Sequence, residues 1–161
     1  MLEKLNPQKT SLVILAVTTA TIAGAWLFQL AGYDPCHLCL LQRWAYYFAI
    51  PFSLLLSVSA GANAKGAQRG LYFLAVIMLG SAVFGAYHAG VEWKWWSGPE
   101  TCSGDISGGL PDLTKKVVAC NEAAIRIFGL SLAGWNAVIS LLMAAVALKG
   151  ARHHGSSSVS Q

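Results

Sequence analysis

Apolar residues occupy four long segments of the chain, and polar residues gather between them. The segments are residues 11–31, 38–60, 71–91 and 128–148. Each is long enough to cross the hydrocarbon core of a bilayer as a helix, which takes about 20 apolar residues. We predict no strand anywhere in the chain. The pattern therefore predicts an all-α membrane protein, a four-transmembrane-helix bundle that forms one domain over residues 1–161.

The composition agrees with a membrane protein. Of the 161 residues, 55% are hydrophobic and only 11% are charged, and the mean hydropathy is +0.53. A soluble domain normally carries about 25% charged residues. The first apolar segment follows Lys4 and Lys9, as a signal peptide would, but it continues past Trp26 and is too long for one. We expect it to remain as the first span.

Basic residues are concentrated on one side of the predicted bundle. They precede the first span, join the second to the third, or follow the fourth: Lys4, Lys9, Lys65, Arg69, Lys149 and Arg152. The positive-inside rule places this side in the cytoplasm. Both termini are then cytoplasmic, and loops 32–37 and 92–127 face outward. The net charge of +4 reflects this asymmetry, so we expect no nucleic-acid site. The polar tail, residues 151–161, is expected to be disordered.

All four cysteines belong to the outward side: Cys36, Cys39, Cys102 and Cys120. An even number of cysteines on an oxidising face implies disulfides, and the sequence leaves three pairings open. Cys36 and Cys39 form a C-x-x-C motif at the start of the second span. Two dithiol pairs on one face of a membrane indicate a relay by thiol–disulfide exchange. A purely structural disulfide in the long loop is the alternative for the second pair.

The C-x-x-C motif is expected to open a helix. Asp34 is a favoured N-cap and Pro35 a favoured first residue, so Cys36 should lie in the first turn, where the helix dipole favours a thiolate. Arg43 follows Cys39 by one turn and shares its face. A cation inside a span is costly and needs a partner. We expect Arg43 to face the bundle interior and to stabilise negative charge on a reduced acceptor.

The C-x-x-C pair must pass two electrons to an acceptor. Cys39 is followed by leucine and not histidine, so the motif for covalent haem attachment is absent. No glycine-rich nucleotide-binding motif is present either. A quinone, which is soluble in the bilayer, fits best. His88, at the outer end of the third span, is either an interfacial histidine or a hydrogen-bond donor to a ligand in the outer leaflet.

In these features the chain resembles the disulfide bond formation protein B family (DsbB), the quinone-dependent thiol oxidases of bacterial inner membranes. The resemblance covers nearly the whole chain except its two tails. The matching residues are Pro35-Cys36-x-x-Cys39, Arg43, His88, Cys102, Cys120 and Phe128-Gly129-Leu130. Gln42 stands where better-known members have an acid beside the arginine, so proton handling by that acid is not expected here.

The resemblance implies the order of the relay. Cys102 would form a mixed disulfide with a periplasmic thioredoxin-fold oxidase of the DsbA type. Cys120 would then attack the C-x-x-C pair at Cys36. The protein would sustain disulfide bond formation by reoxidising this partner.

The resemblance also implies the cofactor site and the location. Cys39 would be the thiol nearest the quinone, and Arg43 and His88 would line the quinone site. The sequence does not distinguish ubiquinone from menaquinone, and it indicates no metal. The expected location is the bacterial inner membrane, with the cysteine loops in the periplasm.

Three alternatives remain at the level of sequence. A vitamin K epoxide reductase-like enzyme would also couple a C-x-x-C pair to a quinone, but its motif usually lies late in the bundle. A metal-binding membrane protein could hold Zn²⁺ by all four cysteine thiolates. A purely structural membrane protein with two disulfides would leave Arg43 unexplained.

Overall fold

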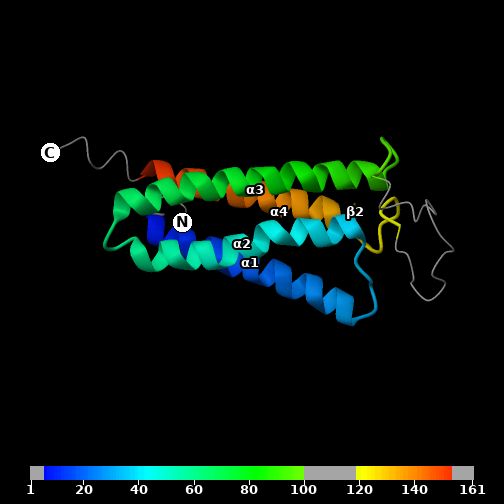
Figure 1. Ribbon diagram of the computed structural model, residues 1–161, viewed down its shortest axis with the longest axis horizontal. Helices are drawn as coiled ribbons and strands as arrows, with labels where there is room; N and C mark the ends of the chain where they lie inside the picture. The colour runs from blue at the N-terminus through cyan, green and yellow to red at the C-terminus, as the bar shows by residue number, and fades with distance from the viewer. Residues whose placement is uncertain (1–5, 100–118, 154–161) are drawn as a thin grey trace, which may run out of the picture.

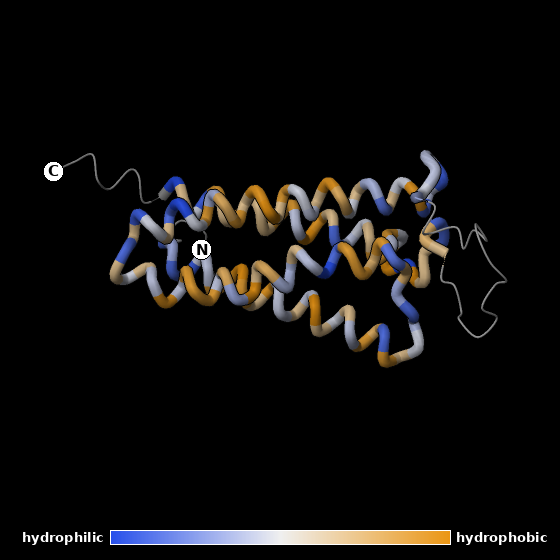
Figure 2. Tube along the Cα trace, in the orientation of Figure 1, coloured by the Kyte–Doolittle hydropathy of each residue, from blue (hydrophilic) through white to orange (hydrophobic). Residues whose placement is uncertain are grey.

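The computed structural model describes residues 6–99 and 119–153, and it is mostly helical. Four helices lie side by side along its long axis (Figure 1): α1 Pro7–Leu30, α2 His37–Ser59, α3 Ala64–Glu92 and α4 Leu132–His153. The link between α2 and α3 lies at the same end as the start of α1 and the end of α4. The loop between α1 and α2 lies at the opposite end. Figure 2 shows that hydrophobic residues follow the helices and that hydrophilic residues gather mainly at the two ends.

Three of these helices are long and apolar enough to cross a membrane: Pro7–Leu30, Ala64–Glu92 and Leu132–Arg152. The predicted second span corresponds to α2, which has 23 residues and therefore a length of about 34 Å. Its sequence is less apolar because it includes Gln42, Arg43 and two tyrosines. The helix nevertheless runs along the same axis as the other three and packs against α1 and α3 (Figure 1).

Asparagine caps begin α1 and α3. The side chain of Asn6 accepts a hydrogen bond from the Lys9 amide at 2.8 Å, with Pro7 as the first helical residue. Asn63 accepts one from the Gly66 amide at 2.8 Å. Each cap satisfies an amide that has no partner inside the first turn of its helix. The polar residues between the apolar segments thus set where these helices start.

The start of α2 differs from the prediction. Asp34 and Pro35 lie before the helix, and the N-cap is Cys36 itself, with extended backbone. Its sulfur accepts the Cys39 amide at 3.2 Å, which is the contact that a capping oxygen would otherwise make. Cys36 therefore precedes the first turn, and its sulfur points back at the helix start.

A short β-hairpin precedes α4, where we predicted no strand. Strand β1 Arg126–Ile127 pairs antiparallel with β2 Leu130–Ser131. The turn residues Phe128 and Gly129 have φ values of 52° and 84°, as a two-residue hairpin turn of type I′ requires. Residues 128–131, which we assigned to the fourth span, thus lie outside the helix. Ser131 accepts the Gly134 amide at 3.1 Å and so caps α4.

The core between the helices changes character along the bundle axis. Aliphatic side chains from all four helices fill the part nearer the termini, including Ile14, Leu56, Leu74 and Met143. Nearer the centre, the Ser140 hydroxyl lies 2.8 Å from the Tyr46 hydroxyl and 3.0 Å from that of Ser81. These bonds connect α2, α3 and α4 where no water is available to polar groups.

A second, smaller cluster lies at the other end of the bundle. It comprises the buried residues Cys36, Leu38 and Cys120, with Cys39 and Phe84 packed against them. The predicted chemistry is therefore concentrated at the end that holds the α1–α2 loop and the hairpin.

Candidate functional site

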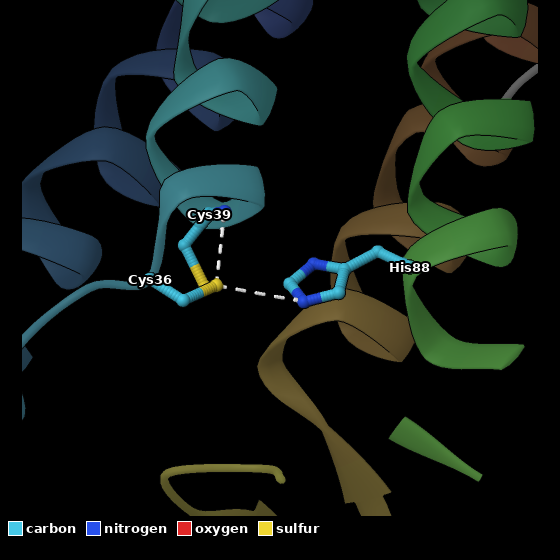
Figure 3. Close-up of side chains that lie close together, drawn as sticks. All are labelled: Cys36, Cys39 and His88. Atoms are coloured by element: carbon cyan, nitrogen blue, oxygen red, sulfur yellow. Dashed lines mark hydrogen bonds between the residues drawn. The ribbon is translucent and has the colours of Figure 1, made fainter. Parts of the chain in front are cut away.

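The two cysteines of the motif lie close together at the start of α2 (Figure 3). Their sulfur atoms are 2.7 Å apart, and both cysteines are free. Cys36 is 5% exposed, whereas Cys39 is half-buried. A small rotation of either side chain would bring the sulfurs to the separation of about 2.05 Å found in a disulfide. The motif is thus arranged to cycle between a dithiol and a disulfide.

His88 reaches Cys36 from α3 (Figure 3), and its side chain is fully buried. Its Nε2 lies 3.5 Å from the Cys36 sulfur. Its Nδ1 lies 2.6 Å from the amide of Gln42, one turn into α2. An amide presents either a donor or an acceptor, so Gln42 orients the ring without adding charge. The imidazole is therefore held between two side chains of α2, with Nε2 directed at Cys36.

These contacts favour the thiolate of Cys36. A hydrogen bond with the Cys39 side chain lowers the pKa of the Cys36 thiol well below its ordinary value, against the opposing effect of burial. The hydrogen bond with His88 and the charge of that ring lower this pKa further. In the reduced protein the surroundings thus favour a negative charge on Cys36.

Glu92 completes this group and was missed as a site residue in the sequence, where we counted it only among the charges of the long loop. It is the last residue of α3 and is 9% exposed. Its Oε1 lies 3.9 Å from Nε2 of His88, one turn earlier on the same helix. The Ser131 side chain of β2 also hydrogen-bonds the carboxyl group. The spacing of four residues between a histidine and an acid was the available signal.

Cys120 lies against the C-x-x-C motif although it is 84 positions from Cys36 in the chain. It is fully buried, belongs to the same cluster as Cys36, and is disulfide-bonded. Cys102, predicted as the other loop cysteine of the relay, lies outside the described residues. The fold thus brings together three of the four predicted cysteines.

A cavity of ≈ 380 Å³ opens beside the motif, lined by residues of α1, α2, α4 and the loops near them. In Figure 1, α1 diverges from α2 toward its C-terminal end, on the side where these residues lie. Cys39, Gln42 and Arg43 contribute polar atoms to a lining that is otherwise mostly apolar. The volume and lining are typical of a site for a small organic ligand.

Arg43 is half-buried and lines the cavity, one turn beyond Cys39. Its guanidinium donates a hydrogen bond to Oε1 of Gln29 on α1 at 2.9 Å. Gln29 is neutral, so this contact orients the guanidinium without adding a charge beside it. His88 is not among the residues that line the cavity. His88 therefore lies outside the cavity that Arg43 lines, whereas Gln42 both lines the cavity and contacts His88.

The geometry does not favour a metal centre. The ligand atoms of Cys36, Cys39 and His88 lie within 4.8 Å of one another. Two thiolates on tetrahedral zinc, each about 2.3 Å from the metal, would lie about 3.8 Å apart. The observed sulfur separation of 2.7 Å is much shorter, and the disulfide of Cys120 removes a ligand from any site built on all four cysteines. The cluster is better suited to disulfide exchange than to metal binding.

Comparison with known proteins also relates the chain to disulfide chemistry. Residues 7–149 match the family model of disulfide bond formation protein DsbB. The chain belongs to the DsbB family. It is 31% identical over 156 residues to disulfide bond formation protein B of Acidovorax sp., covering 88% of this chain and 86% of that protein. It is 30% identical over 138 residues to the protein of that name from Albidiferax ferrireducens, covering 78% and 75%.

A further relative is an uncharacterized protein of Rickettsia prowazekii, RP370, which is 26% identical over 150 residues, 86% of this chain and 81% of that protein. No solved structure matches the chain. Membership of the family identifies a membrane protein of disulfide bond formation, with a thiol oxidoreductase activity. The free cysteine pair at one end of the bundle is the natural place for this chemistry.

Proposed function

We propose that the protein reoxidises a DsbA-like dithiol protein in the periplasm and passes the electrons through two cysteine pairs to a membrane quinone. The protein would thereby sustain disulfide bond formation from the bacterial inner membrane. The observation that carries this proposal is the cavity beside the motif, whose wall holds both the Cys39 sulfur and the Arg43 guanidinium. A thiol and a cation in one mostly apolar cavity suit an acceptor that is apolar when oxidised and gains charge when reduced.

The first part of the relay would use the loop cysteines. We propose that Cys102 and Cys120 form the pair that receives electrons from the partner, through a mixed disulfide at Cys102. The freed Cys120 thiolate would attack Cys36 in the Cys36–Cys39 disulfide. A Cys120–Cys36 bond forms, the Cys36–Cys39 bond breaks, and Cys39 leaves as a thiolate with the electron pair. The burial of Cys120 against Cys36 supports this order.

The second part would take place at the cavity. When bound, a quinone supplies an acceptor for two electrons and two protons. Cys39 would face it, and Arg43 would stabilise the negative charge that develops on it. Burial of the site strengthens this interaction, because the low dielectric of the interior screens charges weakly. The contacts of His88 with Cys36 and Gln42 support a role for it at Cys36.

The proposal is tested by following quinone reduction directly. The protein is purified in detergent, stripped of quinone, and mixed without oxygen with ubiquinone and a reduced DsbA-type protein. Loss of the absorbance of oxidised quinone reports turnover. We expect catalytic turnover in the wild type and none in Cys39→Ser, because the electron pair can no longer reach the cavity.

Leu40→Ser serves as the matched control. Leu40 is the next residue of α2, is 45% exposed, and does not line the cavity. It should retain wild-type turnover. Equal quinone consumption by wild type and Cys39→Ser, or none by the wild type, would contradict the proposed function.

A further inference from the structure

Glu92 is a buried acid that the proposed relay does not yet use. More than nine-tenths of its surface is covered, and its Oε2 atom has no hydrogen-bond partner among the described residues. Buried polar atoms without a partner are rare in native proteins, and each calls for a specific explanation. An acid at a helix end with access to solvent would need no such explanation, but Glu92 is buried beside the cysteine site.

The groups around Glu92 alternate in charge. Nε2 of His88 lies 3.5 Å from the Cys36 sulfur on one side and 3.9 Å from Oε1 of Glu92 on the other. Arg126 of β1 is a further cation near Glu92, and Ser131 of β2 hydrogen-bonds it. The charge of Glu92 also acts on Cys39 of α2. A positive imidazolium between the Cys36 thiolate and the Glu92 carboxylate would therefore be stabilised from both sides.

Gln42 does not balance the charge of a protonated His88 ring. It contacts the other ring nitrogen, Nδ1, but its amide is neutral. Among the residues that His88 contacts in the described part of the chain, Glu92 is the acid. The negative charge that a protonated His88 requires is thus supplied from its own helix.

We propose that Glu92 is a positioning residue for the thiol chemistry, which holds His88 in the protonated state and so keeps Cys36 as a thiolate. The inference rests on the proposed function, since it assigns the proton of one thiol of the relay. It concerns the residue that balances charge, while Cys36 and Cys39 remain the reacting groups.

The step balances without any further reactant. The Cys36 thiol gives its proton to Nε2 of His88, which leaves a thiolate, an imidazolium and the Glu92 carboxylate. In the full reaction, the two thiols lose two electrons and two protons and become a disulfide. A quinone would take up the two electrons and the two protons and become quinol. The proton held on His88 is one of those two. Glu92 itself neither forms nor breaks a covalent bond to sulfur.

The test compares alkylation of Cys36 in wild type and Glu92→Gln. The full-length protein is reduced in detergent and treated with iodoacetamide at a series of pH values, and peptide mass spectrometry assigns the label to Cys36. The midpoint of the resulting rate profile reports the ionisation of this thiol. Glutamine keeps the shape and the bond to Ser131 but removes the charge. We expect the midpoint to lie about one pH unit higher in Glu92→Gln, because loss of a neighbouring charge shifts a buried ionisation by about one unit or more. Well above the midpoint the two rates should agree.

The direction in which the alkylation profile of Cys36 moves distinguishes an effect through His88 from direct repulsion by Glu92. If Glu92 acted on the thiolate directly, its removal would relieve a repulsion, and the midpoint of the alkylation profile would move to lower pH. A midpoint that is unchanged or lower overturns the inference. The matched control is Glu122→Gln, which neutralises an exposed acid of the neighbouring loop and should leave the alkylation profile unchanged.

Two further variants keep the test decisive if Glu92→Gln folds poorly. Glu92→Asp retains the charge and should keep the midpoint of the alkylation profile near that of the wild type. Gln42→Glu combined with Glu92→Gln places a carboxylate at the other nitrogen of the same ring and should return the midpoint toward the wild-type value. Thermal unfolding verifies that each variant is folded. A folded double variant whose midpoint stays at that of Glu92→Gln overturns the inference.

Quinone reduction by the same variants separates this inference from the proposed function. With the wild type active, we expect Glu92→Gln to be at least about tenfold slower at neutral pH, in the range of general acid–base effects. Glu122→Gln should match the wild type. Equal rates for Glu92→Gln and wild type would overturn the role of Glu92 alone. An inactive wild type would instead contradict the proposed function, while the alkylation result would still report on Glu92.

Discussion

At the scale of single residues, the two cysteines of the motif have different surroundings although only two residues separate them. Cys36 caps α2 and contacts His88, whereas Cys39 lines the cavity. The sequence placed both on one face of a helix with Arg43. Because Cys36 precedes the helix, it turns away from that face toward α3. One sulfur is thereby stabilised as a thiolate and the other is presented to the cavity.

This difference predicts unequal reactivity in the reduced protein. Cys36 should be alkylated before Cys39, and its rate at pH 6 should stay close to its rate at pH 7, because its lowered pKa keeps it ionised over this range. An ordinary thiol, with a pKa of about 8.5, loses about tenfold in rate per pH unit below that value. Stopped-time labelling and peptide mass spectrometry measure both rates.

The unfolded protein provides the control for this prediction. In a denaturing detergent Cys36 loses its contacts with Cys39 and His88, so its labelling should fall steeply between pH 7 and pH 6. Labelling of Cys39 ahead of Cys36, or a steep fall in the folded protein, would show that the thiolate is not on Cys36.

At the scale of elements, the site depends on how closely α3 approaches its neighbours, because His88 and Glu92 both lie on α3. Gly85, one turn before His88, makes close contact with α4 possible. A Cβ atom added there would lie 2.9 Å from the backbone nitrogen of Ala137 and 2.9 Å from Nδ2 of Asn136. Small residues at helix interfaces are a general means of close packing in membranes. Here they set the depth at which the ring of His88 reaches α2.

Gly85→Ala should therefore destabilise the protein, by about 1–3 kcal/mol as for an overpacked core. It should also slow quinone reduction, since α3 can relieve the clash only by moving away from α4 and shifting His88. Gly80→Ala is the matched control, because a Cβ atom at Gly80 meets no atom within 4 Å. Thermal unfolding in detergent and the quinone assay test both variants. Equal stability of the two variants would contradict the close approach.

At the scale of the whole molecule, the decisive feature is the position of α2 relative to the membrane. Three helices meet the criteria of length and hydropathy for a span, and three crossings would leave the termini on opposite sides. The start of α1 and the C-terminal end of α4 lie instead at the same end of the bundle (Figure 1). We propose that α2 also crosses and that Gln42, Arg43 and Tyr46 face the cavity and not the lipid, which gives one domain with cytoplasmic termini.

Reporter fusions test this topology. Alkaline phosphatase, which is active only in the periplasm, should be active when fused after Ser97 and inactive when fused after Ala62 or His153. A green fluorescent protein should give the opposite pattern. If α1, α3 and α4 cross and α2 does not, the pattern inverts: the fusions after Ala62 and His153 will be active as alkaline phosphatase, and the fusion after Ser97 will be inactive.

The sequence also had clear limits at each scale. Hydropathy indicated the helical segments, because a bilayer demands long apolar runs whatever their neighbours are. It did not indicate the hairpin before α4, since two strands of two residues each are too short to show a period. The assignment of Cys36 to the first turn was wrong, because a sulfur can cap a helix and the sequence rules favour oxygen.

What the sequence by itself determined is the chemistry available to the protein. The residues of the C-x-x-C motif, Arg43 and the loop cysteines are local features, and the resemblance to the DsbB family, which the comparisons confirm, follows from them. Only the tertiary structure decided which groups meet. His88 contacts Cys36, with Glu92 beside it, because α3 packs against the start of α2, and Cys120 reaches Cys36 from 84 positions away. Such contacts depend on helix packing, which no local pattern of residues specifies.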